Sequence, residues 1–385
     1  MNQRFRDTND LKIVRPPLLI DEIPWQQMNF DGSLTCICED ESLRRIEYSF
    51  RMNLFRDKYF KCDNFIIPFW GIRKSYSSTG NGFNIRENII RAENTDIQSH
   101  HFFDMIPDEA ALEAFHLPVI TPHPEEDAEN MAKMQELFGD TIPVVLEGES
   151  IIYHAPWDVI PRLHGVDNVL YDIYDRPEFL HKIIGLFTDA ARAEMDQKEK
   201  FGLYTSGNVG LHCTPGFVTL PEGKSPENGT CCTTWFRTMA QMFSSISPAA
   251  HEEFDLQYSR PLAERCAYTY YGCCEPLHDR LDYIKKYKNL RKVGASPWAN
   301  VESTAVQLGH DYVMSRKPNP AHVAIKTDPE VIRKEITETV KAAQKYGCPC
   351  DITLKDISTV SNRPENLIVW AETASEVLDE YYGEE

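Results

Sequence analysis

The sequence lacks long apolar runs and the short motifs of several large enzyme classes. No stretch approaches the roughly 20 apolar residues of a membrane-spanning helix, and the polar residues 1–7 have no apolar signal core. Neither GxGxxG nor GxxxxGK(S/T) occurs, which removes support for a nucleotide-binding sheet. GxSxG and HExxH are absent too, so no motif indicates a serine hydrolase or a zinc protease. We therefore expect a cytoplasmic protein with a different chemistry.

Basic residues are in the minority. The 385 residues include 40 Lys and Arg against 59 Asp and Glu, which gives a net charge of −19. Such a surface repels nucleic acids and anionic membranes. The partners that we expect are small molecules and other proteins, and a homo-oligomer is left open.

Cysteine, in contrast, is plentiful. The chain has eleven cysteines, an odd number. In a reducing compartment they are expected as free thiols or metal ligands and not as a disulfide framework. Most of them would then be small buried hydrophobic residues.

Short apolar segments alternate with helical segments of roughly 10–20 residues, which is the pattern of a parallel sheet. The predicted strands are 64–70, 142–147, 201–205, 267–271, 290–295, 311–315 and 350–355. The clearest predicted helices are 41–60, 124–138, 176–200, 234–244, 248–265 and 328–346. We predict an α/β fold, a (β/α)8 TIM barrel over residues 61–385, with an N-terminal extension, residues 1–60, packed on it.

The sequence Tyr271-Gly272-Cys273-Cys274-Glu275-Pro276 follows one of these predicted strands. Active sites of such barrels lie at the carboxyl ends of the strands, and Gly272 can bend the backbone there. Thiolates and carboxylates are ligands that Zn²⁺ accepts. Because neighbouring side chains on a strand point to opposite faces, we expect at most one of the two cysteines to face a site.

Reading the residues after each predicted strand gives the full candidate site. The candidate metal ligands are Cys273, Cys274, Glu147 and His212. The candidate catalytic residues are Glu275, Lys355, Asp356 and Tyr271. Residues expected to shape the pocket or to bind an anionic substrate group are Trp70, Arg73, Asn208, Trp298 and Arg316.

Several of these residues also have a purely structural interpretation. Lys355 and Asp356 are adjacent and could form a structural ion pair. Glu275 could be a solvated carboxylate near a helix start, and His212 could be a loop histidine bonded to the backbone. The sequence leaves these alternatives open.

Three segments carry a resemblance to a known family. The runs Ile20-Asp21-Glu22-Ile23-Pro24-Trp25, 271–276 and Leu354-Lys355-Asp356-Ile357-Ser358-Thr359-Val360 resemble the uroporphyrinogen decarboxylase superfamily, in its corrinoid-linked methyltransferase branch. The resemblance implies a (β/α)8 barrel. The arginine-rich loop that the decarboxylases use for acidic porphyrin side chains has no counterpart in the N-terminal region, which counts against porphyrinogen decarboxylation.

The resemblance also implies a zinc site, with differences. Related methyltransferases hold zinc with His-x-Cys on one strand and a cysteine near the last strand. Cys273 matches the first cysteine, but Tyr271 stands in place of the histidine, and the last cysteine would fall near Asp356 or Ile357. Glu275, His212, Glu147 or Asp356 would have to replace the missing ligands, or no zinc is bound.

Three functions follow as hypotheses. The first is a methyltransferase that moves a methyl group between a small methylated substrate and a corrinoid protein, with or without zinc. No DxHxxG run indicates a cobalamin domain in this chain, so the corrinoid would arrive on a partner protein. The second is a decarboxylase or lyase acting on an acidic substrate through Arg and Lys. The third is a non-catalytic barrel that binds a ligand.

Overall fold

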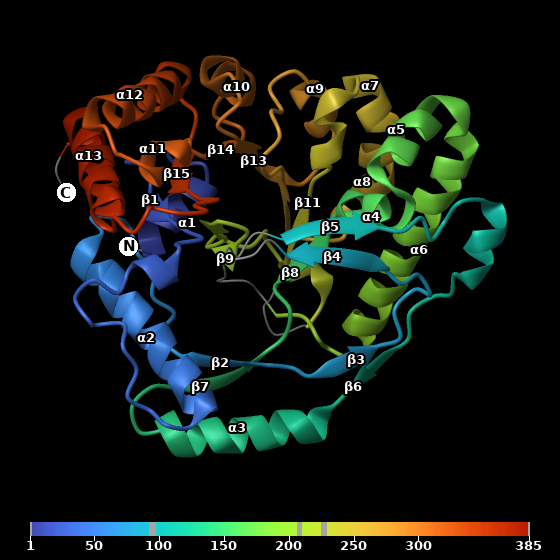
Figure 1. Cartoon of the computed structure of the whole chain (residues 1–385), viewed down its shortest axis with the longest axis horizontal. Helices are drawn as coiled ribbons and strands as arrows, with labels where there is room; N and C mark the ends of the chain where they lie inside the picture. The colour runs from blue at the N-terminus through green and yellow to red at the C-terminus, as the bar shows by residue number, and fades with distance from the viewer. Residues whose placement is uncertain (1, 92–97, 206–209, 225–228, 384–385) are drawn as a thin grey trace.

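The computed structural model of the chain describes residues 2–91, 98–205, 210–224 and 229–383, and it has a mixed α/β fold (Figure 1). Its centre is a seven-stranded parallel sheet with the strand order β1-β15-β14-β13-β12-β11-β8. These strands are Leu18–Ile20 (β1), Ile151–His154 (β8), Trp235–Thr238 (β11), Tyr268–Tyr271 (β12), Leu290–Ala295 (β13), Val313–Arg316 (β14) and Cys350–Leu354 (β15). The predicted α/β class is confirmed.

The closed barrel of the prediction is not confirmed. Within the described residues, no hydrogen-bonded pairing joins the outer strands β8 and β1, so the sheet is open. The other strands form two-stranded pairs: β2 with β7 in parallel, and β3 with β6, β4 with β5 and β9 with β10 antiparallel. Their bounds are Trp70–Arg73 (β2), Tyr76–Ser78 (β3), Glu87–Arg91 (β4), Gln98–Phe102 (β5), Ile120–Pro122 (β6), Val144–Glu147 (β7), Gly210–Leu211 (β9) and Thr214–Pro215 (β10).

Helices line the outer side of the sheet, as α10, α12 and α13 show in Figure 1. Ile352 and Leu354 of β15 are fully buried and share the main core with Ile336 of α12 and Trp370 of α13. The helices are Asn2–Asn9 (α1), Glu41–Tyr59 (α2), Pro124–Phe138 (α3), Ile160–His164 (α4), Val166–Asp175 (α5), Pro177–Lys200 (α6), Pro248–His251 (α7), Gln257–Ala263 (α8), Leu281–Ile284 (α9), Val301–Leu308 (α10), Ala321–Ala324 (α11), Pro329–Tyr346 (α12) and Glu365–Tyr382 (α13). None of the helices in the described part of the chain combines the length and apolar character needed to cross a membrane.

The first sixty residues contribute a strand to the sheet. Leu18 pairs with Ile352 and Ile20 pairs with Leu354, so β1 runs parallel to β15 at the edge of the sheet. All three residues of β1 are buried. The carboxyl end of β1 therefore lies beside the carboxyl end of β15, and this places the residues after both strands together.

Three predicted elements need correction. The strand expected at 64–70 begins only at its last residue, because β2 is Trp70–Arg73. The helix expected at 234–244 is instead the strand β11, because Trp235, Phe236 and Thr238 suit a strand and all four residues of β11 are buried between neighbouring strands. The strand expected at 201–205 is only a single parallel bridge between Tyr204 and Glu149. The helices predicted at 41–60, 124–138 and 176–200 are confirmed as α2, α3 and α6.

Candidate functional site

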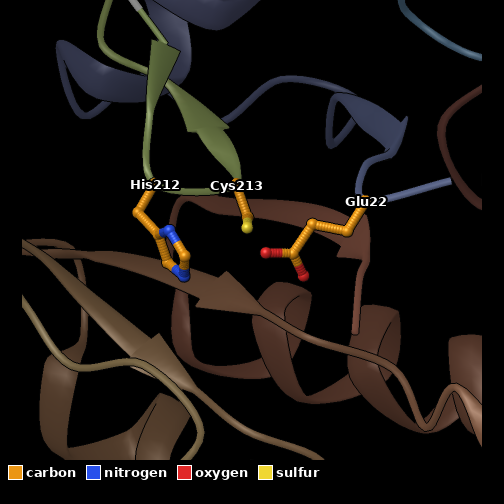
Figure 2. A group of neighbouring side chains, drawn as sticks. All are labelled: Glu22, His212 and Cys213. Carbon is orange, nitrogen blue, oxygen red and sulfur yellow. The ribbon is translucent and has the colours of Figure 1, made fainter. Parts of the chain in front are cut away.

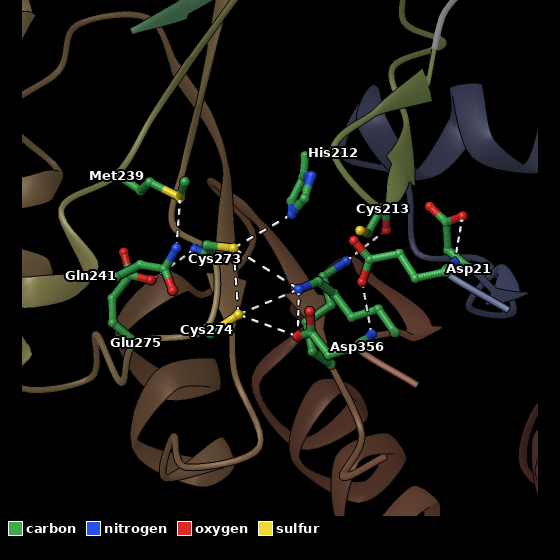
Figure 3. A network of polar contacts seen from close by, with 12 residues as sticks. Asp21, His212, Cys213, Met239, Gln241, Cys273, Cys274, Glu275 and Asp356 are labelled. Atoms are coloured by element: carbon green, nitrogen blue, oxygen red, sulfur yellow. Dashed lines mark hydrogen bonds and ion pairs between the residues drawn. The ribbon is translucent and has the colours of Figure 1, made fainter. Parts of the chain in front are cut away.

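Two thiols meet just beyond the carboxyl end of β12. The strand ends at Tyr271, and Gly272 adopts φ +109°, a conformation that side-chain-bearing residues rarely take. The chain turns there, and the sulfurs of Cys273 and Cys274 lie 3.5 Å apart (Figure 3). The expectation that only one of them faces the site is wrong, because the pair lies in the turn and not on the strand.

A lysine and a carboxylate from the last strand join the two sulfurs. Lys355 Nζ lies 3.4 Å from Cys274 Sγ and 3.9 Å from Cys273 Sγ, and it donates to Asp356 Oδ2 at 2.6 Å. Asp356 Oδ2 in turn accepts from Cys274 Sγ at 3.2 Å. Lys355 and Asp356 therefore form an ion pair that also contacts both thiols, although Lys355 is only 2% exposed.

A hairpin and the end of β1 complete the group from the opposite side. His212 and Cys213 form the turn between β9 and β10, and Glu22 follows β1. One ligand atom from each of these three residues lies within 4.8 Å of the others (Figure 2). His212 Nε2 lies 3.5 Å from Cys273 Sγ, and Glu22 Oε2 accepts from the backbone N–H of Asp356 at 2.8 Å.

We call the residues Cys273, Cys274, His212, Lys355 and Asp356, with Glu22 and Cys213 beside them, the thiol cluster. Three of its members, Glu22, Cys213 and Asp356, have positive φ values of 50°, 54° and 58°. Side-chain-bearing residues adopt this conformation at a cost in free energy, so the folded chain holds these loops in shape.

The charges of the cluster act on its thiols. The hydrogen bond from Cys274, together with the positive charges of Lys355 and Arg237, lowers the pKa of Cys273. The same hydrogen bond and burial raise the pKa of Cys274. One of the two sulfurs is therefore favoured as a thiolate, the form that binds metals and attacks electrophiles.

Glu275 is buried beside the cluster. It is 4% exposed, its Oε2 accepts from the backbone N–H of Cys273 at 3.0 Å, and its Oε1 has no partner. Burial raises the pKa of this carboxyl group, which favours the protonated acid. Glu275 thus has the properties of a proton donor.

Tyr271 faces the other side of the sheet. Its hydroxyl group contacts His251 Nε2 at 2.6 Å and donates to Asp255 Oδ2 at 3.0 Å, and its ring belongs to the main core under the helices. Tyr271, predicted as catalytic, therefore lies away from the thiol cluster, since side chains on a strand alternate between faces.

The structure does not bring the other predicted pocket residues to the thiol cluster. Trp70 packs against the rings of Phe50 and Phe138. Arg73 and Glu147 come from the separate β2–β7 pair and line a cavity of about 750 Å³ at the β8 edge of the sheet. Trp298 is 70% exposed. Asn208 lies outside the described residues.

Arg316 forms an ion pair with Glu335. Its Nη2 donates to Glu335 Oε1 at 2.9 Å and its Nη1 donates to the carbonyl oxygen of Ser296 at 2.5 Å. Together with Glu335 it lines a cavity of about 830 Å³ between α10 and α12. Arg316 therefore lies away from the thiol cluster and already has a carboxylate partner, so its position gives no support to the expected role in binding an anionic substrate group there.

The sequence reasoning missed Glu22. Its approach to the thiols depends on the pairing of β1 with β15, which connects segments more than 300 positions apart. Two signals were present: its place after a short apolar run, which also selected the other strand-end residues, and its place in the segment 20–25 that carries the family resemblance.

Two pairs of donor atoms around Cys273 have the spacing of two ligands of one zinc ion. With Zn–S bonds of about 2.3 Å and Zn–N bonds of about 2.0–2.1 Å, two sulfurs, or a sulfur and a nitrogen, lie about 3.5–3.8 Å apart in a tetrahedral site. The distances of 3.5 Å from Cys273 Sγ to Cys274 Sγ and to His212 Nε2 match these edges. Sulfur and imidazole ligands are also the set that zinc favours over magnesium or calcium.

Comparisons with known proteins find a similar fold and identify no family. No family model matches the sequence, and no curated protein matches it. Among solved structures, the chain is similar to a methyltransferase from Methanosarcina mazei, with a TM-score of 0.52 and 12% sequence identity over 99% of this chain and 98% of that chain. At this identity the similarity concerns the fold, and it extends over the whole length of both chains.

A buried histidine next to the 750 Å³ cavity gives a first testable prediction. His154, the last residue of β8, has no hydrogen-bond partner for Nε2, and burial lowers its pKa from 6.5 to about 4. Between these two values the unfolded chain binds a proton that the folded chain does not, so stability falls as the pH drops from 6.5 towards 4. We expect His154 to contribute about 2 kcal/mol to the loss of unfolding free energy between pH 7 and pH 5.

Urea unfolding at the two pH values measures this loss. His154→Gln should lose about 2 kcal/mol less than the wild type, whereas His310→Gln, at a side chain that is 85% exposed, should behave like the wild type. An equal loss in the wild type and in His154→Gln would contradict the assignment.

Proposed function

We propose that this protein is a methyltransferase that moves a methyl group between a small methylated substrate and a corrinoid protein, with zinc bound in the thiol cluster. One observation carries the proposal. Adjacent thiols, an imidazole and carboxylates from four separate segments converge at the carboxyl ends of parallel strands, with sulfur–sulfur and sulfur–nitrogen distances of 3.5 Å. The similarity of the fold to a methyltransferase from Methanosarcina mazei supports it.

The chain's own donors define how zinc would be held. Cys273 and His212 would be two ligands, and the others would come from Cys274, Cys213 or Glu22, which lie beside them. When bound, zinc would act as a Lewis acid on the sulfur or oxygen atom that carries or accepts the methyl group.

The remaining side chains have roles that follow from their contacts. Lys355 lies 3.4 Å and 3.9 Å from the two sulfurs, so its charge stabilises a thiolate there. Asp356 orients Lys355 through its hydrogen bond of 2.6 Å. Burial raises the pKa of Glu275, and in this proposal Glu275 donates a proton to a leaving group from the side of the Cys273 backbone. The corrinoid is bulky and would be presented by the partner protein over the open end of the strands.

We also propose that the open sheet is a (β/α)8 barrel interrupted between β8 and β1. The central strands are all parallel and follow one another in chain order from β8 to β15, with helices on the outer side. Closing the gap between β8 and β1 requires further parallel strands. The parallel β2–β7 pair and the parallel bridge between Glu149 and Tyr204 are segments of this kind.

A decarboxylase or lyase is the second candidate, and one observation favours it. Lys317 is 2% exposed and donates to the carbonyl oxygen of Cys213 and to Ser315 Oγ, and within the described residues no carboxylate lies within 4.0 Å of its ammonium group. Such a buried cation suits an acidic substrate. This reaction would need no metal.

Metal analysis and a methyl-transfer assay separate the candidates. We expect close to one zinc per chain in the wild type and thiol-dependent demethylation of free methylcobalamin, followed by absorbance. Cys273→Ser should lose both, whereas Cys36→Ser, at a half-buried thiol in another part of the chain, should keep both. A metal-free wild type, or a Cys273→Ser variant with full zinc and full transfer activity, would contradict the proposal.

A further inference from the structure

Arg237 lies on β11, next to the edge strand β8, on the face opposite the main helices. Side chains of β11 alternate between the two faces. Phe236 belongs to the core under the helices, whereas Trp235 packs with Tyr268 and Tyr270 on the other face. The side chain of Arg237 points to the same face as that of Trp235. Arg237 pairs in register with Tyr153 of β8 and with Tyr270 of β12.

This guanidinium group is buried without a carboxylate partner. Arg237 is 2% exposed, and its Nε has no partner. Its Nη2 contacts the sulfur of Met239 at 3.3 Å, and its guanidinium carbon lies 4.9 Å from the ring centre of Tyr153. Within the part of the chain that the structure describes, no carboxylate oxygen lies within 4.0 Å of the group. Burying a charge without a partner costs several kcal/mol, roughly, unless another charge or dipole compensates.

Two other buried cations of the same sheet have a carboxylate partner. Lys292 of β13 lies 2.7 Å from Asp351 Oδ2, and Arg316 of β14 lies 2.9 Å from Glu335 Oε1. Arg237 is as buried as these residues but has two tyrosine rings and a thioether where they have a carboxylate. Its missing partner is therefore expected to come from outside the chain.

The position of Arg237 connects the thiol cluster to a cavity. Met239, which contacts the guanidinium group, packs with Cys273 in a small apolar cluster. On the other side, Tyr153 is 55% exposed and lines the cavity of about 750 Å³ at the β8 edge. Arg237 is therefore separated from this cavity by the ring of Tyr153, and its other side is linked to Cys273 through Met239.

We propose that Arg237 binds a small oxyanion, a carboxylate or a sulfonate, carried by the substrate whose methyl group or thiol reacts at the thiol cluster. The planar fork of an arginine binds such groups through two parallel hydrogen bonds, and the unpartnered Nε is one of the donors that the fork needs. The assignment of the anion to a methyl-transfer substrate rests on the proposed function, but the anion site itself does not.

Thermal unfolding of the full-length protein tests the site without any turnover. The probes are sodium acetate and sodium methanesulfonate, each compared with sodium chloride at equal ionic strength. We expect the wild-type Tm to rise by about 2 °C over the chloride reference at a concentration ten times Kd. Arg237→Gln should show no rise over chloride, and Arg237→Lys should show a smaller rise because it keeps the charge and loses the fork.

Arg192→Gln is the matched control, because it removes the same charge from an exposed position on α6. It should respond to the anions like the wild type. Without anions, Arg237→Gln should unfold at a temperature no lower than the wild type, since it removes an uncompensated charge. A wild type that does not distinguish the oxyanions from chloride, or an Arg237→Gln variant that responds like the wild type, would overturn the proposal.

Zinc content and methyl transfer, measured on the same samples, keep this proposal separate from the proposed function. An anion response that depends on Arg237 in a zinc-free, inactive protein would overturn the methyltransferase and leave the anion site standing. Bound zinc and thiol-dependent methyl transfer without any anion response would overturn the anion site and leave the methyltransferase standing.

Discussion

Replacing Asp351 with leucine is expected to lower the free energy of unfolding by about 3–5 kcal/mol, because it leaves a buried cation without its partner. Asp351 is 1% exposed and accepts from Lys292 Nζ at 2.7 Å, from Ser315 Oγ at 2.6 Å and from Thr214 Oγ1 at 3.0 Å. After the substitution Lys292 would keep only its contact with Thr214. Chemical denaturation at pH 7 measures the loss.

Two further variants show whether the charge causes the loss. Lys292→Met should cost less than Asp351→Leu, because Asp351 would keep two hydroxyl donors and the nearby charge of Lys317. The double variant Lys292→Met/Asp351→Leu should recover part of the stability that Asp351→Leu loses. A double variant that is less stable by the sum of the two single effects would show that no coupling exists between the charges.

The second large effect is expected from Gly272→Ala. At φ +109° an added Cβ would meet Leu277 Cδ1 at 2.7 Å and the backbone nitrogen of Gly294 at 3.3 Å. The strained backbone and the contact with β13 should together cost about 3 kcal/mol of unfolding free energy. Urea unfolding gives this number, and metal analysis of the same variant reports whether the two thiols have moved.

Gly202→Ala is the control for the conformation alone. Gly202 has φ +64°, and an added Cβ would meet nothing within 4 Å. It should cost about 1 kcal/mol, the penalty of the left-handed conformation without a steric contact. Equal losses in the two variants would mean that the close approach of Gly272 to β13 carries no energy.

The order of the elements was readable from the sequence because each one is defined by local patterns. The strand Val144–Glu147 begins with three apolar residues, and Pro329–Tyr346 carries an aspartate cap, a proline at its start and a glycine after its end. The α/β class follows from such segments. Whether the sheet closes does not, because closure depends on the strands at 70–73 and 144–147, which are short and half-exposed.

The candidate site was readable in part for the same reason. The carboxyl ends of parallel strands meet at one edge, which is why Cys273, Lys355 and Asp356 were expected together and are found together. The partners of Arg316 and Tyr271 were not readable, because Glu335 and Asp255 lie on helices whose packing the strand pattern does not specify. The direction of Cys274 depended on a single backbone angle at Gly272.

The backbone of the thiol cluster has a consequence for how this protein can change over time. Of the six non-glycine residues with positive φ in the described chain, Glu22, Cys213 and Asp356 belong to the cluster. Glycine at any of these positions would relax the main chain and remove a side chain of the thiol cluster in the same step. At these three positions a gain in the free energy of unfolding would therefore come with the loss of a cluster side chain, so the two cannot be improved independently.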